Sequence, residues 1–344
     1  MYSSNLMKKW RLPLLFGLLV CSLTGALFFG AYSMSVAEVC SALLGQAASQ
    51  SDFLIWHIRL PRVLLAAFSG AGLAISGAAI QGLFRNPLAD QGLIGVTSGA
   101  MLFAVLSIVF MGSLLVEFSE WIQQGIVVVF AFVGGLITTY LVYWLSRRDG
   151  KTYVMQMLLA GIAVSAFAAA ITGALIYLSD DQQLRDITFW SLGSFSSSNW
   201  IQVAIVVPVV TFGIVALCRY ARALNAMLLG EMEAMYLGIR VEKVKFGIIS
   251  LTALIVGVCI AMSGMIGFVG LVIPHFLRLL NGTDYRHLLI HSALAGAVFM
   301  IFADTMARTI IAPAELPIGI LTAMVGAPFF IWLMVRSQRE RMHL

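Results

Sequence analysis

Long uncharged stretches alternate with short polar segments along the whole chain. The stretch between Arg62 and Arg85 holds about 22 residues, which as a helix would span roughly 33 Å, the thickness of the hydrocarbon core of a bilayer. A break follows at Pro87, because proline lacks an amide donor and disfavours helical backbone at the residue before it. Small residues recur every four positions within the stretch and form a ridge that another helix can approach closely: Ala66, Gly70, Ala74, Ala78 and Gly82.

Similar stretches along the rest of the chain predict ten membrane-spanning helices. The predicted spans are residues 12–37, 63–84, 93–112, 121–145, 152–178, 200–217, 246–262, 267–280, 288–308 and 317–335. Residues 35–52 are amphipathic and too polar to cross a membrane, so we expect them at the outer surface. The expected fold class is an all-α polytopic membrane protein, in which residues 1–344 form a single transmembrane domain.

Composition supports residence in a membrane. The 344 residues are 60% hydrophobic and only 11% charged, whereas about a quarter of the residues in a soluble domain carry charge. The net charge of +5 is spread over short basic clusters between apolar stretches, and these clusters form no arm or stripe that would suit nucleic acid. We therefore expect contact with membrane lipid and none with nucleic acid.

The distribution of Lys and Arg predicts the orientation of the chain. If the N-terminus is cytoplasmic, all but four of the 21 basic residues lie in inside segments, in agreement with the positive-inside bias. An even number of spans then places both termini in the cytoplasm. The four exceptions are Arg59, Arg62, Arg185 and Arg308.

Two blocks of sequence resemble those of a known family. The first contains RLPR at 59–62, FRNPLAD at 84–90 and GLIGVTSGA at 92–100; the second is GFVGLVIPHFLRLLNGTDYRHLL at 267–289, followed by ADTMAR and AELPIGILTAMVGAPFFIWLM. Over nearly its whole length the chain resembles the FecCD-type permeases, membrane subunits of ABC importers for iron-siderophores, haem and cobalamin. The resemblance implies a type II ABC importer permease fold in the bacterial inner membrane. It also implies a second copy of the chain, two copies of an ABC ATP-binding subunit and a periplasmic substrate-binding protein.

Three of the four exceptional arginines lie at the outer ends of predicted spans, so we expect them to project at the outer face. From the residues alone they anchor helix ends, or Arg308 pairs with Asp304 one turn earlier. By resemblance, Arg59, Arg62 and Arg308 occupy positions that dock acidic residues of the periplasmic binding protein. A guanidinium group suits this task, because its planar donors hold a carboxylate in two hydrogen bonds.

The fourth exception, Arg185, lies in the segment SDDQQLRDITFW at 179–190. Its aspartate neighbours make a solvated loop charge one interpretation. The segment is also similar to the haem branch of the family, in which this arginine lies near the outer mouth of the substrate path and could meet a haem propionate. The resemblance therefore favours haem as the substrate, with iron-siderophore or cobalamin as the alternatives.

The longest inside segment, residues 219–245, alternates apolar and charged positions and is divided by two glycines, which predicts two short amphipathic helices. Such helices could lie on the membrane surface, but their acidic residues do not suit an anionic leaflet. By resemblance this segment is the coupling loop that fits a cleft of the ATP-binding subunit. The residues assigned to this coupling are Leu224, Gly230, Glu231, Glu233 and Gly238.

The resemblance also assigns the moving parts. The substrate path would run between two copies of the chain, lined mainly by the fifth and tenth spans. Residues 147–152 would form the inner gate and residues 184–195 the outer gate. The fifth span carries a ridge of small residues suited to close packing or to the border of a cavity: Gly161, Ser165, Ala169 and Gly173.

Catalytic motifs are missing from the sequence. Residues 150–152 read Gly-Lys-Thr, like the end of a phosphate-binding loop, but Leu145 stands where the first glycine of that motif would be. We therefore expect no enzymatic activity, no cofactor and no metal site, and ATP hydrolysis by a separate subunit. An ion-coupled secondary transporter is the alternative from another class, but it would need charged residues near the membrane midplane, and the predicted spans contain almost none.

Overall fold

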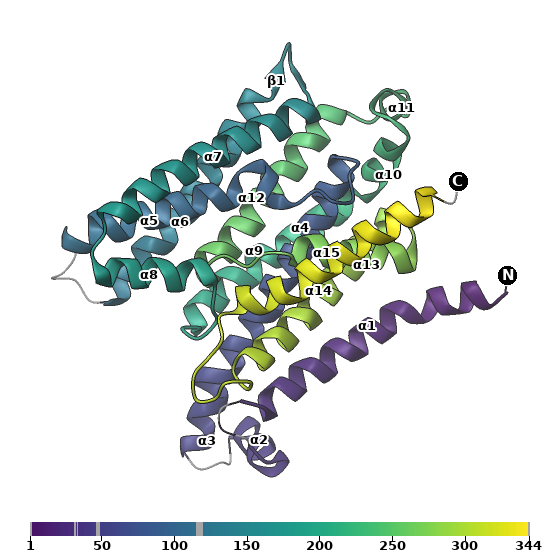
Figure 1. Cartoon of the computed structure of the whole chain (residues 1–344). Helices are drawn as coiled ribbons and strands as arrows, with labels where there is room; N and C mark the ends of the chain where they lie inside the picture. Colours follow the sequence, from purple (N-terminus) through teal and green to yellow (C-terminus); the bar gives the residue numbers. More distant parts are fainter. Residues whose placement is uncertain (1, 31, 33, 46–48, 115–119, 343–344) are drawn as a thin grey trace.

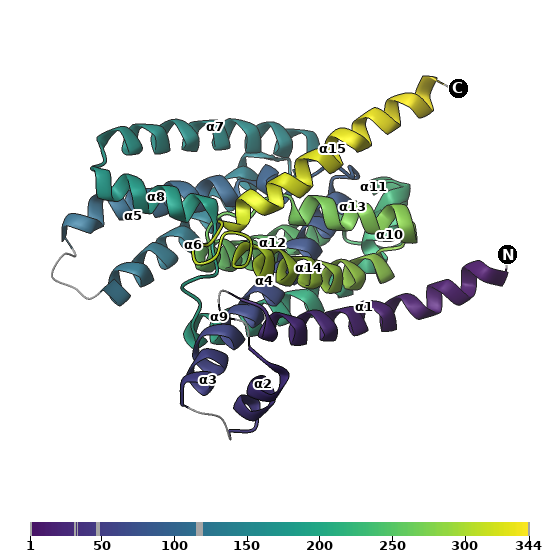
Figure 2. The same cartoon turned by 60° about the horizontal axis from the view of Figure 1, so that its bottom comes forward.

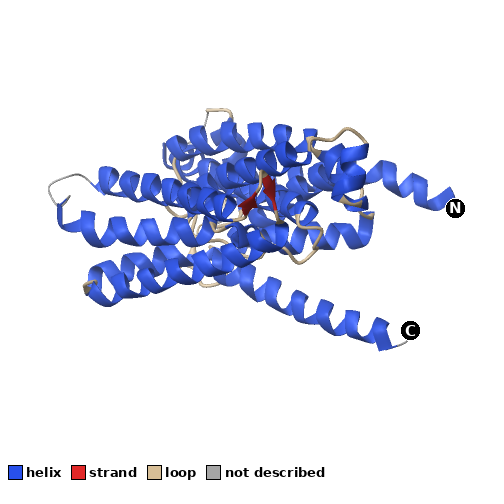
Figure 3. Cartoon of the chain, turned by 90° about the horizontal axis from the view of Figure 1, so that it is seen from above, coloured by secondary structure: helices blue, strands red, loops and turns tan. Residues whose placement is uncertain are grey.

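The structure is a computed structural model that describes residues 2–30, 32, 34–45, 49–114 and 120–342. Almost all of this part of the chain is helical, and its strands form one short antiparallel hairpin, β1 (Arg147–Arg148) and β2 (Lys151–Thr152). Figure 3 shows this hairpin against the surrounding helices. The predicted all-α membrane fold is confirmed.

The helices follow the predicted spans closely. In chain order they are α1 (Tyr2–Phe28), α2 (Val36–Leu43), α3 (Ser49–Phe53), the π-helix η1 (Leu54–Arg59), α4 (Leu60–Leu83), the 3₁₀-helix η2 (Gln91–Ile94), α5 (Val96–Leu114), α6 (Glu120–Leu145), α7 (Val154–Leu178), α8 (Asp181–Leu192), α9 (Trp200–Arg219), α10 (Ala221–Leu229), α11 (Glu231–Tyr236), α12 (Val241–Ser263), α13 (Val269–Asn281), α14 (Tyr285–Ala307) and α15 (Ile318–Met342).

Seven helical segments of the described chain are long and apolar enough to cross a membrane. One runs through α3, η1 and α4 (Gln50–Leu83), and the others lie in α1, α6, α7, α9, α12 and α14. Shorter apolar helices of 10–17 residues lie in α5, α13 and α15, where the remaining spans are predicted. Ten crossings therefore stay a prediction, because the apolar segments within these helices are shorter than the about 20 residues that a typical bilayer requires.

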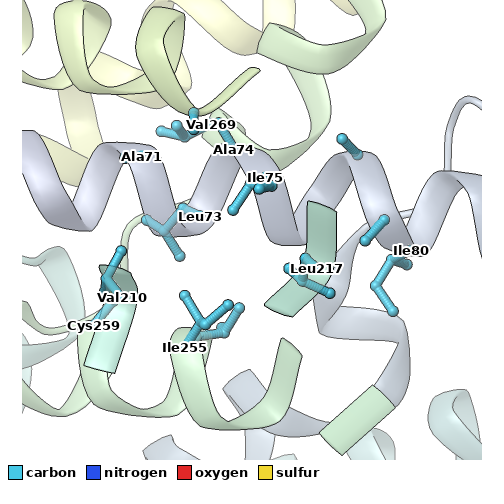
Figure 4. Close-up of a cluster of buried hydrophobic side chains, with 14 of the residues drawn as sticks. Ala71, Leu73, Ala74, Ile75, Ile80, Val210, Leu217, Ile255, Cys259 and Val269 are labelled. Carbon is cyan, nitrogen blue, oxygen red and sulfur yellow. The ribbon is translucent and has the colours of Figure 1, made fainter. Parts of the chain in front are cut away.

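Helix α4 lies at the centre of the bundle, and nearly all of its residues are buried. Helices α9, α12, α13 and α14 pack around it, and Figure 4 shows Leu73 and Ile75 of α4 among side chains of α9, α12 and α13. A Cβ atom on Gly70 would collide with the backbone of Gly296 in α14, and Ala74 packs beside the same glycine. The small-residue ridge predicted on this helix is therefore confirmed as the surface on which a second helix backbone packs.

The predicted break after this helix is also confirmed. α4 ends at Leu83, and Arg85 adopts a positive φ of 51° just before Pro87. The chain then turns back through η2, and Gly95, with φ 84°, leads into α5. A left-handed backbone at this point favours glycine, because a Cβ atom would be strained there.

The first predicted span is too long at its C-terminal end. It was expected to reach residue 37, but α1 ends at Phe28. The predicted span extends into a second helix, α2, which starts at a capping box formed by Ser35 and Glu38. Within the predicted outer segment 35–52, residues 46–48 lie outside the described residues.

Short elements gather at two opposite ends of the molecule. Figure 1 shows β1, α10 and α11 at one end and α2 and α3 at the other. In Figures 1 and 2 the N-terminal end of α1 and the C-terminal end of α15 lie on the same side of the molecule. Following the orientation predicted from the positive charges, we call the end with α10 and α11 the inner end and the end with α2 and α3 the outer end.

Candidate docking, passage and coupling sites

At the outer end, Arg62 near the start of α4 binds two carboxylates from distant parts of the chain. Its Nε donates to the two carboxylate oxygens of Asp304 in α14, at 2.9 and 3.1 Å. Its two Nη atoms donate to the carboxylate of Glu315, between α14 and α15, at 2.7 and 2.9 Å. Arg62 therefore joins three segments through charge-assisted hydrogen bonds.

The other two arginines predicted to dock a partner lie near this site. Arg308 donates to the carbonyl oxygen of Ala26 at 2.6 Å, and its Nε lies 3.7 Å from Asp304. Arg59 donates to two backbone carbonyl groups at and just after the end of α1. We call the three arginines, together with Asp304 and Glu315, the outer arginine cluster.

Burial of the cluster corrects the expectation that its arginines project at the outer face. Arg59, Arg62 and Arg308 are only 3%, 5% and 4% exposed. A buried guanidinium group must be paired to offset its loss of hydration. These three arginines find their hydrogen-bond partners within the same chain. Glu315 keeps 35% of its side chain exposed, so a partner can reach this carboxylate. The docking role of the arginines stays a prediction.

Arg185 lies on α8, a helix that our sequence analysis did not predict. The helix begins at a capping box formed by Asp180 and Gln183. The Arg185 side chain is exposed and donates to the side-chain oxygen of Gln182 at 2.8 Å, and Gln182 in turn donates to Asp186 at 3.2 Å. The guanidinium group therefore bonds a neutral amide and not a carboxylate next to it.

A cavity of about 860 Å³ lies beside α8. Residues of α5, α6, α8, α9 and α12 line it, and Arg185 is not one of them. Polar and aromatic side chains from α8, its N-cap and α9 contribute to the lining: Asp180, Gln183, Asp186, Phe189, Trp190 and Gln202. Arg185 thus lies on the same helix as several lining residues, and its place at the mouth of a substrate path stays a prediction.

At the inner end, residues 219–245 form the two short helices that were predicted, α10 and α11. Gly230 between them has φ 143°, and Gly238 after α11 has φ 81°, values that favour glycine. Glu233 is exposed. Leu224 is fully buried, so its side chain packs beneath these helices instead of facing an ATP-binding subunit, which corrects that assignment.

Exposed apolar side chains gather along the same segment. They are Leu228, Leu229, Met232, Met235, Tyr236 and Leu237. Several exposed apolar side chains within one short segment are typical of a binding surface. We call these side chains the inner apolar patch.

Behind α11 lies a buried ionic network that our sequence analysis missed. Lys245 of α12 is only 1% exposed, and its Nζ donates to the carbonyl oxygen of Thr152 at 2.7 Å, to Glu231 at 2.7 Å and to Glu242 at 3.2 Å. Glu242 also accepts from the amide of Thr152 at 2.9 Å. We call these four residues the Lys245 network. The Glu242 and Lys245 spacing of three was visible in the sequence, but nothing there indicated Thr152 or Glu231 as partners.

A second polar link at the inner end joins α10 to α14. Asp284, the N-cap of α14, accepts from the side-chain amide of Asn225 at 2.6 Å and from the backbone amide of Arg286 at 3.0 Å. Asn225 in turn accepts from the amide of Tyr285 at 2.9 Å. The hydrogen bond from Asn225, followed by that from Arg286, lowers the pKa of Asp284 below its ordinary value, because both stabilise the ionised carboxylate.

Helices α7 and α15, which were predicted to line a path, both present exposed apolar side chains. The small-residue ridge of α7 is divided: Gly161 packs against the backbone of Leu93 and Ser165 hydrogen-bonds to α5, whereas Ala169 and Gly173 are exposed. The exposed apolar residues are Met155, Leu159, Ile162 and Phe167 on α7, and Met324, Val325, Ile331 and Trp332 on α15.

Comparison with protein families matches residues 17–336 to the FecCD transport family. The hemin transport system permease protein HmuU of Yersinia pestis is 42% identical over 332 residues, which cover 94% of this chain and 95% of that protein. The cobalamin import system permease protein BtuC of Halobacterium salinarum is 39% identical, over 83% of this chain and 74% of that protein. The vitamin B12 import system permease protein BtuC of Salmonella typhi is also 39% identical, over 85% and 86%.

Solved structures give a consistent result. A metal-chelate type ABC transporter in an inward-facing conformation matches with a TM-score of 0.82 and 35% identity, over 94% of this chain and 99% of that chain. PsaBC from Streptococcus pneumoniae, solved in complex with Fab, matches with a TM-score of 0.53. At 17% identity, this second similarity concerns the fold alone.

Proposed function

Because this chain belongs to the FecCD transport family and is a permease subunit of an ABC importer, we propose that it carries haem across the bacterial inner membrane. A periplasmic binding protein delivers the haem at the outer end. A separate ATP-binding subunit drives the movement from the inner end, and both termini lie in the cytoplasm. The chain itself catalyses no reaction.

Arg185 is the observation that carries the choice of haem. Its guanidinium group is exposed on α8, and its hydrogen bond within the described residues goes to the neutral side-chain amide of Gln182 in its own helix turn. It is therefore available to pair with a carboxylate, and haem carries two propionates. The 42% identity with the hemin permease of Yersinia pestis supports the same cargo. The cobalamin permeases at 39% identity make cobalamin the alternative, together with iron-siderophores.

Two copies of the chain would enclose the substrate path. The exposed apolar side chains of α7 and α15 support this arrangement, because a second copy would cover part of them. Two ATP-binding subunits would contact the inner apolar patch, with Glu233 beside it as a charged contact. Apolar side chains surrounded by charged ones are typical of such interfaces.

The outer arginine cluster would dock the binding protein by exchange of carboxylates. Arg62 holds Glu315 through two hydrogen bonds, and Glu315 is the member of the cluster with the greatest exposure. A carboxylate of the binding protein can replace Glu315 on the same guanidinium group, while Asp304 keeps its own hydrogen bonds to Arg62. The arginines thus act in docking without first becoming exposed.

Reconstitution tests the function. The permease and its ATP-binding subunit are placed in liposomes with a binding protein loaded with haem, an iron-siderophore or cobalamin. We expect the haem-loaded protein to stimulate both ATP hydrolysis and uptake. We expect Arg185→Ala to lower haem uptake about tenfold, the scale of a lost charge-assisted hydrogen bond, while Arg185→Lys keeps most of it.

Each of the other outcomes would contradict a different part of the proposed function. Stimulation only by cobalamin or by an iron-siderophore would change the cargo and leave the ABC mechanism in place. Haem uptake by Arg185→Ala at the wild-type rate would remove Arg185 from the path. Uptake that follows an ion gradient and ignores ATP would instead indicate a secondary transporter.

A further inference from the structure

We propose that Lys245 is a positioning residue that transmits movement of α11 to the β1–β2 hairpin at the start of α7. The inference rests on the proposed function, because it concerns how ATP-driven movement at the inner end reaches the gate. It adds a specific connection between α11 and the β1–β2 hairpin. That connection is the Lys245 network.

The network joins three elements through a single ammonium group. Lys245 belongs to α12, Glu231 is the first residue of α11, and Thr152 is the last residue of β2. The ammonium group has three hydrogens, and its three acceptors are Thr152, Glu231 and Glu242. Its hydrogen-bonding capacity is therefore filled by these neighbours, with two of the three acceptors on other elements.

Burial makes this connection resistant to separation. The Lys245 side chain is 2% exposed, and a buried ammonium group that loses a carboxylate partner pays a large desolvation cost. If α11 moved away alone, Lys245 would lose its hydrogen bond of 2.7 Å to Glu231. The lower-energy movement is one in which α11, Lys245 and the hairpin move together.

Thr152, at the hairpin end of the connection, makes two hydrogen bonds within the Lys245 network. Thr152 accepts from Lys245 through its carbonyl oxygen and donates to Glu242 through its amide. The strand pairing of Arg147 with Thr152 fixes the hairpin register, and α7 begins two residues later, at Val154. A displacement of Thr152 is therefore passed both to the hairpin, which is the predicted inner gate, and to the start of α7, a predicted path helix.

Exposed side chains of α11 are in a position to receive the movement. Met232 and Tyr236 of the inner apolar patch are exposed and lie on other sides of the helix than Glu231, which is bonded to Lys245. Gly230 and Gly238 flank α11 with positive φ, and glycine permits the backbone rotation that a small displacement of this helix requires. α11 thus has one face for a partner and one contact with the gate.

The test uses the complete complex of permease, ATP-binding subunit and binding protein in liposomes. Uptake and ATP hydrolysis are measured together, so that the result is the amount of substrate moved per ATP. The variants are Lys245→Met, which removes the ammonium group, and Lys245→Arg, which keeps a cation. Lys243→Met is the matched control, because Lys243 lies on the same helix and is exposed. Glu242→Gln is a milder variant, because the Glu242 side chain is 36% exposed.

We expect Lys245→Met to hydrolyse ATP at close to the wild-type rate and to move about tenfold less substrate per ATP, a typical size for coupling between sites. Lys245→Arg should recover part of this ratio, Glu242→Gln should show a smaller loss, and Lys243→Met should match the wild type. A purely structural role would lower hydrolysis and uptake in parallel and leave the ratio unchanged.

Two results would overturn the inference. One is a wild-type ratio in Lys245→Met, or in Glu242→Gln if Lys245→Met fails to assemble. The other is a ratio that falls equally in Lys243→Met. If instead the wild-type complex shows no ATP-driven uptake, the proposed function fails before any variant is compared, so the two failures are distinguishable.

Discussion

Individual charged residues buried in this chain have their partners on other elements. Arg62 of α4 is paired with Asp304 and Glu315 at the outer end, and Lys245 of α12 with Glu231 of α11 at the inner end. The burial of such groups is favourable only when all their hydrogen bonds are satisfied. Substitution of one partner therefore affects the others, because it leaves a charge in apolar surroundings.

The first prediction concerns Asp304, which binds Arg62 and lies 3.7 Å from Arg308. We expect Asp304→Ala to lower the free energy of unfolding by about 3–5 kcal/mol, because Arg62 and Arg308 both lose a buried carboxylate. Unfolding in detergent, followed by circular dichroism, measures this loss. Glu315→Gln is the comparison and should cost less, because the Glu315 side chain is 35% exposed. Equal stability of Asp304→Ala and wild type would show that the cluster does not hold these helices together.

The second prediction concerns the N-cap residue Asp284. Asp284→Ala should lower the free energy of unfolding by about 1 kcal/mol at neutral pH, the usual cost of a lost N-cap. The folded-state pKa of Asp284 lies below its ordinary value. The stability that this shift contributes is therefore fully present above about pH 4 and is lost as the pH falls through the folded-state pKa.

Unfolding measured at several pH values checks whether this stability is lost toward acid pH. The difference between wild type and Asp284→Ala should shrink as the solution becomes strongly acidic. Asp284→Asn serves as the control, because asparagine also caps helices well but carries no titrating carboxyl group. A difference that grows toward acid pH would contradict the assignment.

At the scale of elements, glycines determine how closely the helices approach. Gly77 of α4 lies against the backbone of Gly270 in α13, and Gly70 lies against Gly296 in α14. Between membrane helices, close backbone approach provides much of the packing energy, because lipid supplies little hydrophobic driving force for association. These contacts fix the positions of α13 and α14 on the central helix.

The third prediction tests this packing. A Cβ atom at position 77 would collide with the carbonyl group of Gly270, which is backbone and cannot swing aside. We expect Gly77→Ala to destabilise the protein by about 3 kcal/mol, near the upper end for overpacking. Gly125→Ala is the matched control, because it lies in α6 with no atom near its Cβ position and should be neutral or slightly stabilising through helix propensity. Thermal unfolding of the purified variants compares them, and equal melting temperatures would be evidence against the close contact.

At the scale of the whole molecule, the core is built around α4 while α7 and α15 have exposed apolar side chains. The exposed side chains of α7 include Leu159 and Phe167, and Ala169 on the same helix is also exposed. Such side chains contact either lipid or another protein. The proposal of a path between two copies assigns part of this surface to the second copy.

The fourth prediction tests that assignment by cross-linking. Ala169→Cys is introduced into a chain whose exposed cysteines, Cys21 and Cys40, are replaced by serine. A bifunctional maleimide should then link two copies, seen as a band of doubled mass on a gel. Phe212→Cys on α9, which is 61% exposed, should react with single maleimides but give no linked pair. Linkage at position 212 as efficient as at 169, or at neither position, would contradict the arrangement.

Prediction from sequence succeeded for the long helices and for the glycine breaks at 230 and 238, since both depend on local composition. It was less accurate where short-range capping decided the outcome. The capping box at Ser35 starts α2 within one predicted span, and the capping box at Asp180 starts α8 in a segment expected to be a loop. The capping-box residues, three positions apart, were visible in the sequence, but a prediction from hydrophobic patterning alone does not take them into account.

The sequence alone determined that this chain is a helical membrane protein of the FecCD family, because apolar length, small-residue spacing and family motifs are properties of neighbouring residues. Only the tertiary structure decided which charges meet. Arg62 and Asp304 are 242 positions apart, and Lys245 and Thr152 are 93 apart. Pairs so distant in the chain are brought together by packing around α4, and their burial arises from the same packing.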